Sequence, residues 1–221
     1  MSKKLIHIFG YLVKNLLYLL LPQQCTGCGT KHTYLCRDCL SRISYPDHSK
    51  QNNIFAAGSY KDEWLKKAVW ILKYRKGSSA AEPLAELVFQ RIFLEGRIKN
   101  PSEFLYVPVP LSKERIKKRG FNQSEIIGRH LVEKLSLEKE ALAVGILEKI
   151  KETKTQASIR DYQQRLKNLE GAFAVKNPEA IQGKKIILID DVSTTGTTIR
   201  ECTKTLKKAG AKKVIGVVVA K

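Results

Sequence analysis

Residues 186–198 read IILIDDVSTTGTT and join two adjacent carboxylates to a loop of small hydroxyl-bearing residues. The aliphatic run from Ile186 to Ile189 predicts a buried strand, with Asp190 and Asp191 following at its carboxyl end. Ligands of open α/β sheets lie beyond the carboxyl ends of strands, and N–H groups at a helix N-terminus bind phosphate. The loop residues that precede the next predicted helix are Ser193, Thr194, Thr195, Gly196, Thr197 and Thr198. Because carboxylates accept hydrogen bonds from sugar hydroxyls, the expected ligand is a ribose 5-phosphate.

Over its whole length this segment resembles the motif with which type I phosphoribosyltransferases bind 5-phosphoribosyl 1-diphosphate (PRPP). The resemblance implies that Asp190 and Asp191 hold the ribose 2′ and 3′ hydroxyls, while the loop holds the 5′-phosphate. It also implies Mg²⁺ as a companion of PRPP. The chain has no GxxxxGK[ST] or GxGxxG phosphate loop. The alternative is an ordinary strand–turn–helix with a threonine cap, but two consecutive acids and five Ser/Thr residues in one loop favour the ligand site.

Four cysteines form a second constellation, in which two CxxC pairs are separated by seven residues. Each CxxC can place two thiolates on one metal ion, and four thiolates in a tetrahedral array suit Zn²⁺. The predicted ligands are Cys25, Cys28, Cys36 and Cys39. Two disulfides or a redox CxxC are the rival interpretations, and both fit less well with a reducing cytosol and a doubled motif. A site with four protein ligands leaves no open position, so we expect the zinc to be structural.

The chain is strongly basic, with 40 Lys+Arg against 21 Asp+Glu in 221 residues, a net charge of +19. Such a field attracts polyanions, and nucleic acid is the favoured class. The alternative, solubility alone, does not require a charge of this size. The length suggests one domain plus an appendage.

The N-terminal segment, residues 1–22, contains an apolar stretch interrupted by His7, Lys14 and Asn15. It has no small-residue cleavage site, and a central lysine disfavours a membrane span. Its apolar residues share one helical face, which predicts an amphipathic helix packed on the protein or on a partner. Peripheral membrane contact is the less favoured alternative. We expect a cytoplasmic protein, with the inner face of the membrane as an alternative location.

Between these features the sequence alternates predicted strands and helices. Strands are expected at 54–59, 104–109, 144–150, 172–175, 186–189 and 214–219, and helices at 60–74, 81–97, after residue 122, and at 199–208. Gly210 marks the end of the last helix. This order predicts an α/β fold with a mostly parallel sheet flanked by helices.

One predicted loop, 111–123, has five cations in seven residues and is expected to trap anions. The cations are Lys113, Arg115, Lys117, Lys118 and Arg119. Cys202 is expected to be a small core residue without chemistry. The two tryptophans, Trp64 and Trp70, are expected in the core, although single-strand binding sites also use such rings to stack bases.

The order of all these motifs resembles the ComF family of bacterial competence proteins, particularly its ComFC-type members. The resemblance covers about residue 22 to the C-terminus and includes the cysteine pairs, LKYRKG, VPVPLSKERIKKRGFNQSE, KTQ…R…N…GAF and IILIDDVSTTGTT. It implies a type I phosphoribosyltransferase fold behind a zinc finger. The expected organisation is a helix at 1–22, a zinc finger at 23–45 and a phosphoribosyltransferase-like domain at 54–221.

The family resemblance also implies a role in natural transformation, in which the protein handles incoming single-stranded DNA. Residues 110–119 would be the pyrophosphate-binding loop, and residues 154–165 a flexible lid. The lid candidates are Lys154, Gln156, Arg160 and Arg165. A DNA-translocating helicase is a candidate partner of the zinc finger, as is DNA itself.

Three functions fit this sequence: a DNA-binding module, a PRPP-regulated DNA-binding protein and an active phosphoribosyltransferase. Only two residues follow Val219, whereas purine-salvage enzymes of this fold carry a base-binding segment there. This shortness weakens the case for a free nucleobase as acceptor. DNA binding with PRPP as a bound ligand is favoured, and a Mg²⁺-dependent phosphoribosyltransferase is the alternative.

Overall fold

A computed structural model describes residues 23–46, 53–74, 78–153 and 168–221. The predicted N-terminal helix and all four lid candidates lie outside these residues, as does most of the polar segment 46–53. The α-helices are α2 (Arg37–Ser41), α3 (Glu63–Tyr74), α4 (Ala81–Val88), α5 (Lys113–Arg119), α6 (Gln123–Lys134) and α8 (Thr197–Lys208). The strands are β1 (Ile54–Gly58), β2 (Phe104–Pro108), β3 (Leu147–Lys149), β4 (Phe173–Val175), β5 (Lys185–Val192) and β6 (Lys213–Ala220). A π-helical turn, Phe89–Leu94, continues α4, and short 3₁₀ turns lie at Ser78–Ala80, Pro101–Glu103, Lys139–Ala141 and Glu179–Ile181.

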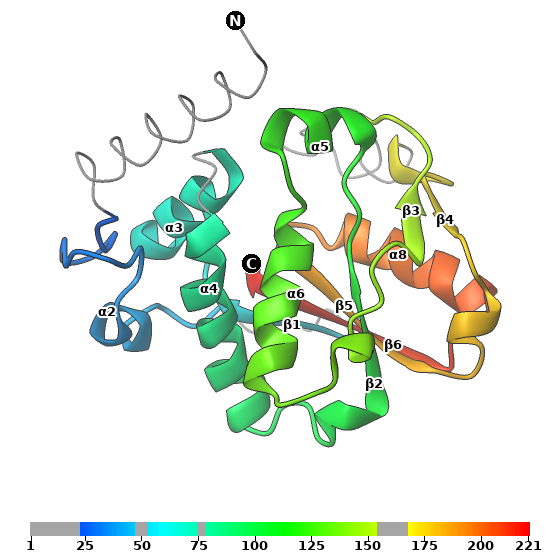
Figure 1. The fold of residues 1–221 in the computed structure, drawn as a ribbon, viewed down its shortest axis with the longest axis horizontal. Coiled ribbons are helices and arrows are strands. Elements are labelled where there is room, and N and C mark those ends of the chain that lie inside the picture. Colours follow the sequence, from blue (N-terminus) through cyan, green and yellow to red (C-terminus); the bar gives the residue numbers. More distant parts are fainter. Residues whose placement is uncertain (1–22, 47–52, 75–77, 154–167) are drawn as a thin grey trace, which may run out of the picture.

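Four parallel strands form the central sheet in the order β1-β6-β5-β2, with helices on both sides (Figure 1). In β5, Ile187 and Ile189 pack into the core that contains α3, α4 and α6. Ile186 and Leu188 pack on the other face, against the core that contains α8. Successive side chains of a strand point to opposite faces, so an uninterrupted aliphatic run can bury both. The predicted mostly parallel α/β fold is confirmed.

The predicted strands at 144–150 and 172–175 exist, but they lie outside the central sheet. They are the short β3 and β4, which pair with each other antiparallel. The predicted loop at 111–123 is also only partly correct, because residues 113–119 form α5. Lysine, arginine and glutamate favour helices, and Gly120 ends this helix at φ +85°. The sequence analysis interpreted this segment from its charge alone and did not consider that its residues favour a helix.

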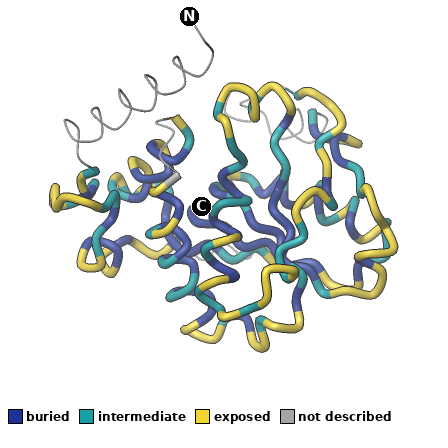
Figure 2. The backbone as a smooth tube through the Cα atoms, viewed as in Figure 1, coloured by how far each residue is buried: buried dark blue, intermediate teal, exposed yellow. Residues whose placement is uncertain are grey.

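The residues from the cysteine pairs to Ile43 share the core of the helices beside them. Here the cysteine module means residues 23–45. Its Leu35, Leu40 and Ile43 are each 2% exposed and belong to the same cluster as the buried faces of α3 and α4. Residues coloured as buried occur both in this module and in the neighbouring helices (Figure 2). The cysteine module is therefore packed as part of a continuous core.

Arg91 also links the cysteine module to the sheet. Its side chain is 5% exposed and donates hydrogen bonds to the carbonyls of Ala57 in β1 and of Ile43. The guanidinium also lies 4.0 Å from the centre of the Tyr45 ring. A planar cation that donates to carbonyls in two segments holds their relative position.

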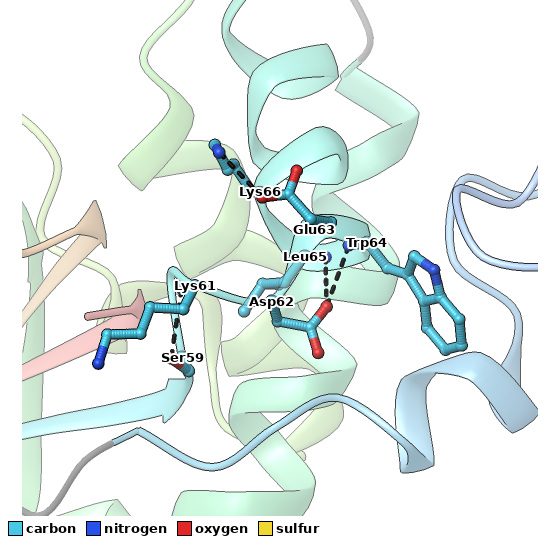
Figure 3. Close-up of polar contacts among 7 residues, drawn as sticks. All are labelled: Ser59, Lys61, Asp62, Glu63, Trp64, Leu65 and Lys66. Carbon is cyan, nitrogen blue, oxygen red and sulfur yellow. Dashed lines mark hydrogen bonds and ion pairs between the residues drawn. The ribbon is translucent and has the colours of Figure 1, made fainter.

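Asp62 caps α3. Its Oδ1 accepts hydrogen bonds from the backbone N–H groups of Trp64 (3.0 Å) and Leu65 (3.1 Å), as Figure 3 shows. Its Oδ2 accepts from the N–H and the hydroxyl of Ser44, at 3.0 Å each. Burial by itself raises the pKa of Asp62, but these donors outweigh it and the net pKa is lowered. Asp62 thus fixes the start of α3 and ties it to the cysteine module.

Replacing Asp62 with alanine should destabilise the protein by about 1–2 kcal/mol, because N2 and N3 of α3 lose their acceptor. Asp62→Asn is the matched control, since asparagine is also a good cap. Urea unfolding followed by circular dichroism measures both. Because the folded-state pKa is lowered, the contribution of Asp62 is present above the ordinary pKa of 3.8 and is lost as pH falls through the folded-state pKa. Equal stability of Asp62→Ala and wild type at pH 7 would contradict the capping role.

Candidate functional site

A cavity of about 220 Å³ opens where β5 ends. Asp190 and Asp191 lie inside β5, because β6 runs alongside as far as Ala220 and pairs with it to Val192. The sequence interpretation ended this strand at Ile189, where the apolar run stops and residues with low strand propensity begin. Both acids line the cavity with the threonine loop, defined here as residues 193–198.

The threonine loop turns sharply into α8. Its first residue is anchored, because Ser193 N donates to the carbonyl of Ala220 at the end of β6. Gly196 is the N-cap of α8 with φ +77°, a left-handed conformation that strongly favours glycine. The first turn of a helix directs N–H groups away from the helix, toward whatever lies before it. Here the cavity lies there, and such an end favours an anion.

Asp190 is held by two donors, the Ser124 hydroxyl at 3.0 Å and the N–H of Asp191 at 2.9 Å, both on Oδ1. Burial and the neighbouring charge of Asp191 together raise the pKa of Asp190 to about 7, although these hydrogen bonds and the charge of Lys73 act in the opposite direction. The Asp190 carboxyl therefore gains and loses its proton near neutral pH.

Lys73 forms an ion pair with one of the two acids. Its Nζ lies 3.2 Å from Asp191 Oδ1, and the side chains are only 18% and 11% exposed. Burial by itself lowers the pKa of Lys73, but the charges of Asp191 and Asp190 outweigh it and the net pKa is raised. Sequence reasoning missed Lys73 because it belongs to α3, far from β5 in the chain.

Basic side chains from α5 and β3 also line the cavity. Arg115 and Arg119 of the predicted anion trap line the cavity, whereas Lys113, Lys117 and Lys118 do not. Lys149 of β3 joins them, and its pKa is lowered by burial and by the charge of Arg115. Gln123, 1% exposed, accepts from Arg119 at 2.9 Å. Two cations near one another, with one partly desolvated, would be stabilised by an anion between them.

The four predicted zinc ligands also come together. The sulfurs of Cys25, Cys28, Cys36 and Cys39 all lie within 4.8 Å of one another. Residues Gln24 and Lys31 pair as a short antiparallel bridge around the first CxxC, and Cys36 begins α2, which carries Cys39. Hydrogen bonds from Thr30 lower the pKa of Cys28 to about 6, which favours the thiolate that binds metal. Four cysteine sulfurs at this separation fit a Zn²⁺ ion, so the cluster can hold a metal such as zinc.

The structure also tests the predicted burial of Cys202 and of the two tryptophans. Cys202 is fully buried against the sheet, as predicted. Trp64 packs against the core next to Gly27. The prediction for Trp70 is wrong, because this residue is 48% exposed. No helix within the described residues is both long and apolar enough to cross a membrane.

Comparison with known proteins shows what the second half of this chain is similar to. Residues 116–221, which contain β5, the threonine loop and α8, match the family model of the phosphoribosyl transferase domain. A solved structure titled "Structure of the allosteric regulatory enzyme of purine biosynthesis" aligns with 64% of this chain and 25% of its own, with 20% identity and a TM-score of 0.40.

The relatives of this chain are competence and DNA utilization proteins, and the predicted resemblance to the ComF family is confirmed. This chain is 40% identical over 122 residues to competence protein ComFC of Streptococcus pneumoniae, and the alignment covers 55% of this chain and 50% of that protein. It is 32% identical over 141 residues to the DNA utilization protein YhgH of Salmonella typhi, covering 63% of this chain and 60% of that one. The alignments thus span about half to three fifths of these two relatives.

Proposed function

We propose that this protein binds PRPP in the cavity at the end of β5 and handles single-stranded DNA during natural transformation. The observation that carries the proposal is that the acids, the threonine loop and two arginines of α5 line one cavity. The names of the relatives, competence protein and DNA utilization protein, support the link to DNA.

In this proposal a different group of cavity residues binds each part of PRPP. The threonine loop and the N-terminus of α8 receive the 5′-phosphate. Asp190 and Asp191 accept hydrogen bonds from the ribose hydroxyls, and Arg115, Arg119 and Lys149 face the diphosphate. Mg²⁺, which prefers oxygen ligands, would neutralise the diphosphate when bound. Lys73 pairs with Asp191 and holds its carboxylate in place.

Single-stranded DNA is proposed to bind the basic surface around α5, next to the cavity. Lys117 and Lys118 are on α5 but not in the cavity, so their charges are available to phosphates outside it. DNA lacks the ribose 2′ hydroxyl, which leaves one acid underused if a nucleotide enters in the PRPP pose. Surface binding beside the PRPP site therefore fits better than binding inside it.

Catalysis is the second candidate function, and the presence of acids and arginines in one cavity favours it. Transfer of the phosphoribosyl group passes through a cation-like ribose while diphosphate leaves. In this reaction the acids would stabilise the developing positive charge, and the arginines would stabilise the leaving group. Release of diphosphate from PRPP in the presence of candidate acceptor bases would establish this activity.

The proposal is tested by fluorescence anisotropy of a labelled single strand titrated with zinc-loaded protein, with and without PRPP and Mg²⁺. Wild type should bind, with an affinity that changes when PRPP is present. No binding at near-physiological salt would overturn the DNA-handling role and leave the catalytic alternative.

The same titration tests the α5 surface. The three lysines of α5, Lys113, Lys117 and Lys118, are exposed and do not line the cavity. The variant Lys113→Gln/Lys117→Gln/Lys118→Gln should reduce the slope of log K against log salt by about 2, because each lost phosphate contact contributes about 0.7. The matched control, Lys184→Gln/Lys212→Gln/Lys213→Gln, removes equal charge at exposed positions near the opposite ends of β5 and β6. It should leave the slope nearly unchanged. Equal slopes for the α5 variant and wild type would exclude this surface as the DNA contact.

A further inference from the structure

Two large aromatic side chains stand exposed on α3, at the rim of the cavity. Trp70 is 48% exposed and Tyr74 is 57% exposed, and their ring centres are 5.7 Å apart. Tyr74 also lines the cavity. We name Trp70 and Tyr74 the aromatic pair. Large aromatic side chains are usually largely buried, so the exposure of two of them side by side needs a reason.

The aromatic pair lies on the face of α3 that points away from the core. The buried residues of α3 are Leu65, Ala68, Val69, Ile71 and Leu72. At about 100° per residue, Trp70 lies roughly 180° from the middle of this stripe. Lys67 is exposed toward the same side, as is Lys66, which pairs with the exposed Glu63 at 3.0 Å. The exposed face of α3 thus combines aromatic rings with cations.

A third cation completes the arrangement from another element. The guanidinium of Arg119 lies 5.5 Å from the centre of the Tyr74 ring. Arg119 in turn belongs to the basic side chains that line the cavity. The aromatic pair is therefore continuous with the anion-binding surface of α5.

We infer that the aromatic pair is a base-stacking platform for single-stranded nucleic acid. Sites of this kind combine aromatic rings, which stack on any base, with cations that track the phosphates. From Lys67 to Tyr74 is about 10 Å along the helix axis, longer than a single base, so the surface suits a strand rather than a lone nucleobase. The strand would run along α3 and bring its phosphates to Arg119 and the rest of α5. This inference rests on the proposed DNA binding and names where the bases lie.

The test compares two labelled strands of equal length, oligo(dT) and one whose bases are replaced by abasic sites. Trp70→Leu and Tyr74→Leu should each weaken oligo(dT) binding at least about fivefold. Neither should change binding of the abasic strand, and the slope of log K against log salt should stay as in wild type, because no charge is lost. Trp70→Phe, which keeps a ring, should bind oligo(dT) nearly as well as wild type.

A second measurement follows the tryptophan fluorescence of the protein. Oligo(dT) should quench tryptophan emission of wild type on binding, whereas the abasic strand should not. The chain has two tryptophans, and Trp64 is partly buried beside the cysteine module. Trp70→Leu should therefore remove most of the quenching, and its unchanged affinity for PRPP would show that the fold is intact, since Trp70 does not line the cavity.

The outcomes separate this inference from the proposed function. If wild type binds neither strand, both fail. Should wild type bind oligo(dT) and the leucine variants bind it equally well, the platform alone is overturned. The platform is also overturned if the variants weaken both strands alike, or if wild type binds oligo(dT) without quenching, because the contact would then not involve bases.

Discussion

Removing the metal from the cysteine cluster should lower the melting temperature of the whole protein by ten degrees or more. A structural zinc contributes on the order of 10 kcal/mol in small zinc peptides, and even part of this exceeds the usual margin of stability. Cys25 and Cys39 are buried in the same cluster as Leu65 and Leu84, so loss of the cysteine module exposes the faces of α3 and α4. We therefore expect one transition at lower temperature rather than melting of the module alone.

Thermal unfolding followed by circular dichroism, with and without a zinc chelator, measures this effect. Cys39→Ala and Cys202→Ala make the same small deletion at two buried positions, of which only Cys39 belongs to the cluster. Cys39→Ala should resemble the chelated protein and respond little to chelator. Cys202→Ala should lose only a few degrees and still respond. An unchanged main transition after complete removal of zinc would contradict the shared core.

Replacing Asp191 with alanine should weaken PRPP binding by about 10- to 100-fold. A hydrogen bond between a charged group and a ligand contributes about 1.5–3 kcal/mol. The substitution also leaves Lys73, which is 18% exposed, without its ion-pair partner at 3.2 Å. Isothermal titration calorimetry with PRPP and Mg²⁺ measures the loss. The control Asp38→Ala removes an equal charge from α2 in the cysteine module and should bind like wild type.

The neighbouring acid adds a dependence on pH. Since the pKa of Asp190 is about 7, its carboxylate is present above that pH and is neutralised below it. An ionised Asp190 accepts hydrogen bonds from ribose hydroxyls, so affinity for PRPP should rise as pH increases from 6 to 8. The phosphate of the ligand also titrates near pH 6. The variant Asp190→Asn cannot ionise at this position, so its affinity for PRPP should increase less between pH 6 and 8 than that of wild type. An identical increase in the variant would show that the pH dependence comes from the ligand.

The contiguous parts of the candidate site were predictable from the sequence. A strand, two acids and a threonine loop lie within 13 residues, so their order alone places them at one end of a helix and a strand. The cysteine pairs are likewise local, and their spacing is a property of metal sites. Helical periodicity also located α3 and α6 because both bury one clear stripe.

The parts that the sequence did not predict come from distant elements. Lys73 reaches Asp191 only because α3 packs near the end of β5, and Lys149 arrives on a short strand outside the central sheet. Lys73 lies within the LKYRKG motif, but that motif does not show which residue the lysine meets, and the chain around Lys149 has no such motif. Trp70 is different, since its place opposite the apolar stripe of α3 was readable from helical geometry. The sequence analysis instead relied on the general tendency of tryptophan to lie in protein cores, and therefore placed Trp70 there.

The order of strands in the sheet has a consequence for how the chain folds as it is synthesised. The two inner strands, β5 and β6, are the last two in the chain, whereas β1 and β2 form the edges. Ile54 pairs with Gly216, so β1 leaves the ribosome long before its partner exists. Sheets built from such distant pairings form slowly, and strands that have not yet paired can aggregate through their free edges. The nascent chain must therefore keep β1 and β2 protected until the last strands emerge, and the helices and cysteines between and before them are already present to do so.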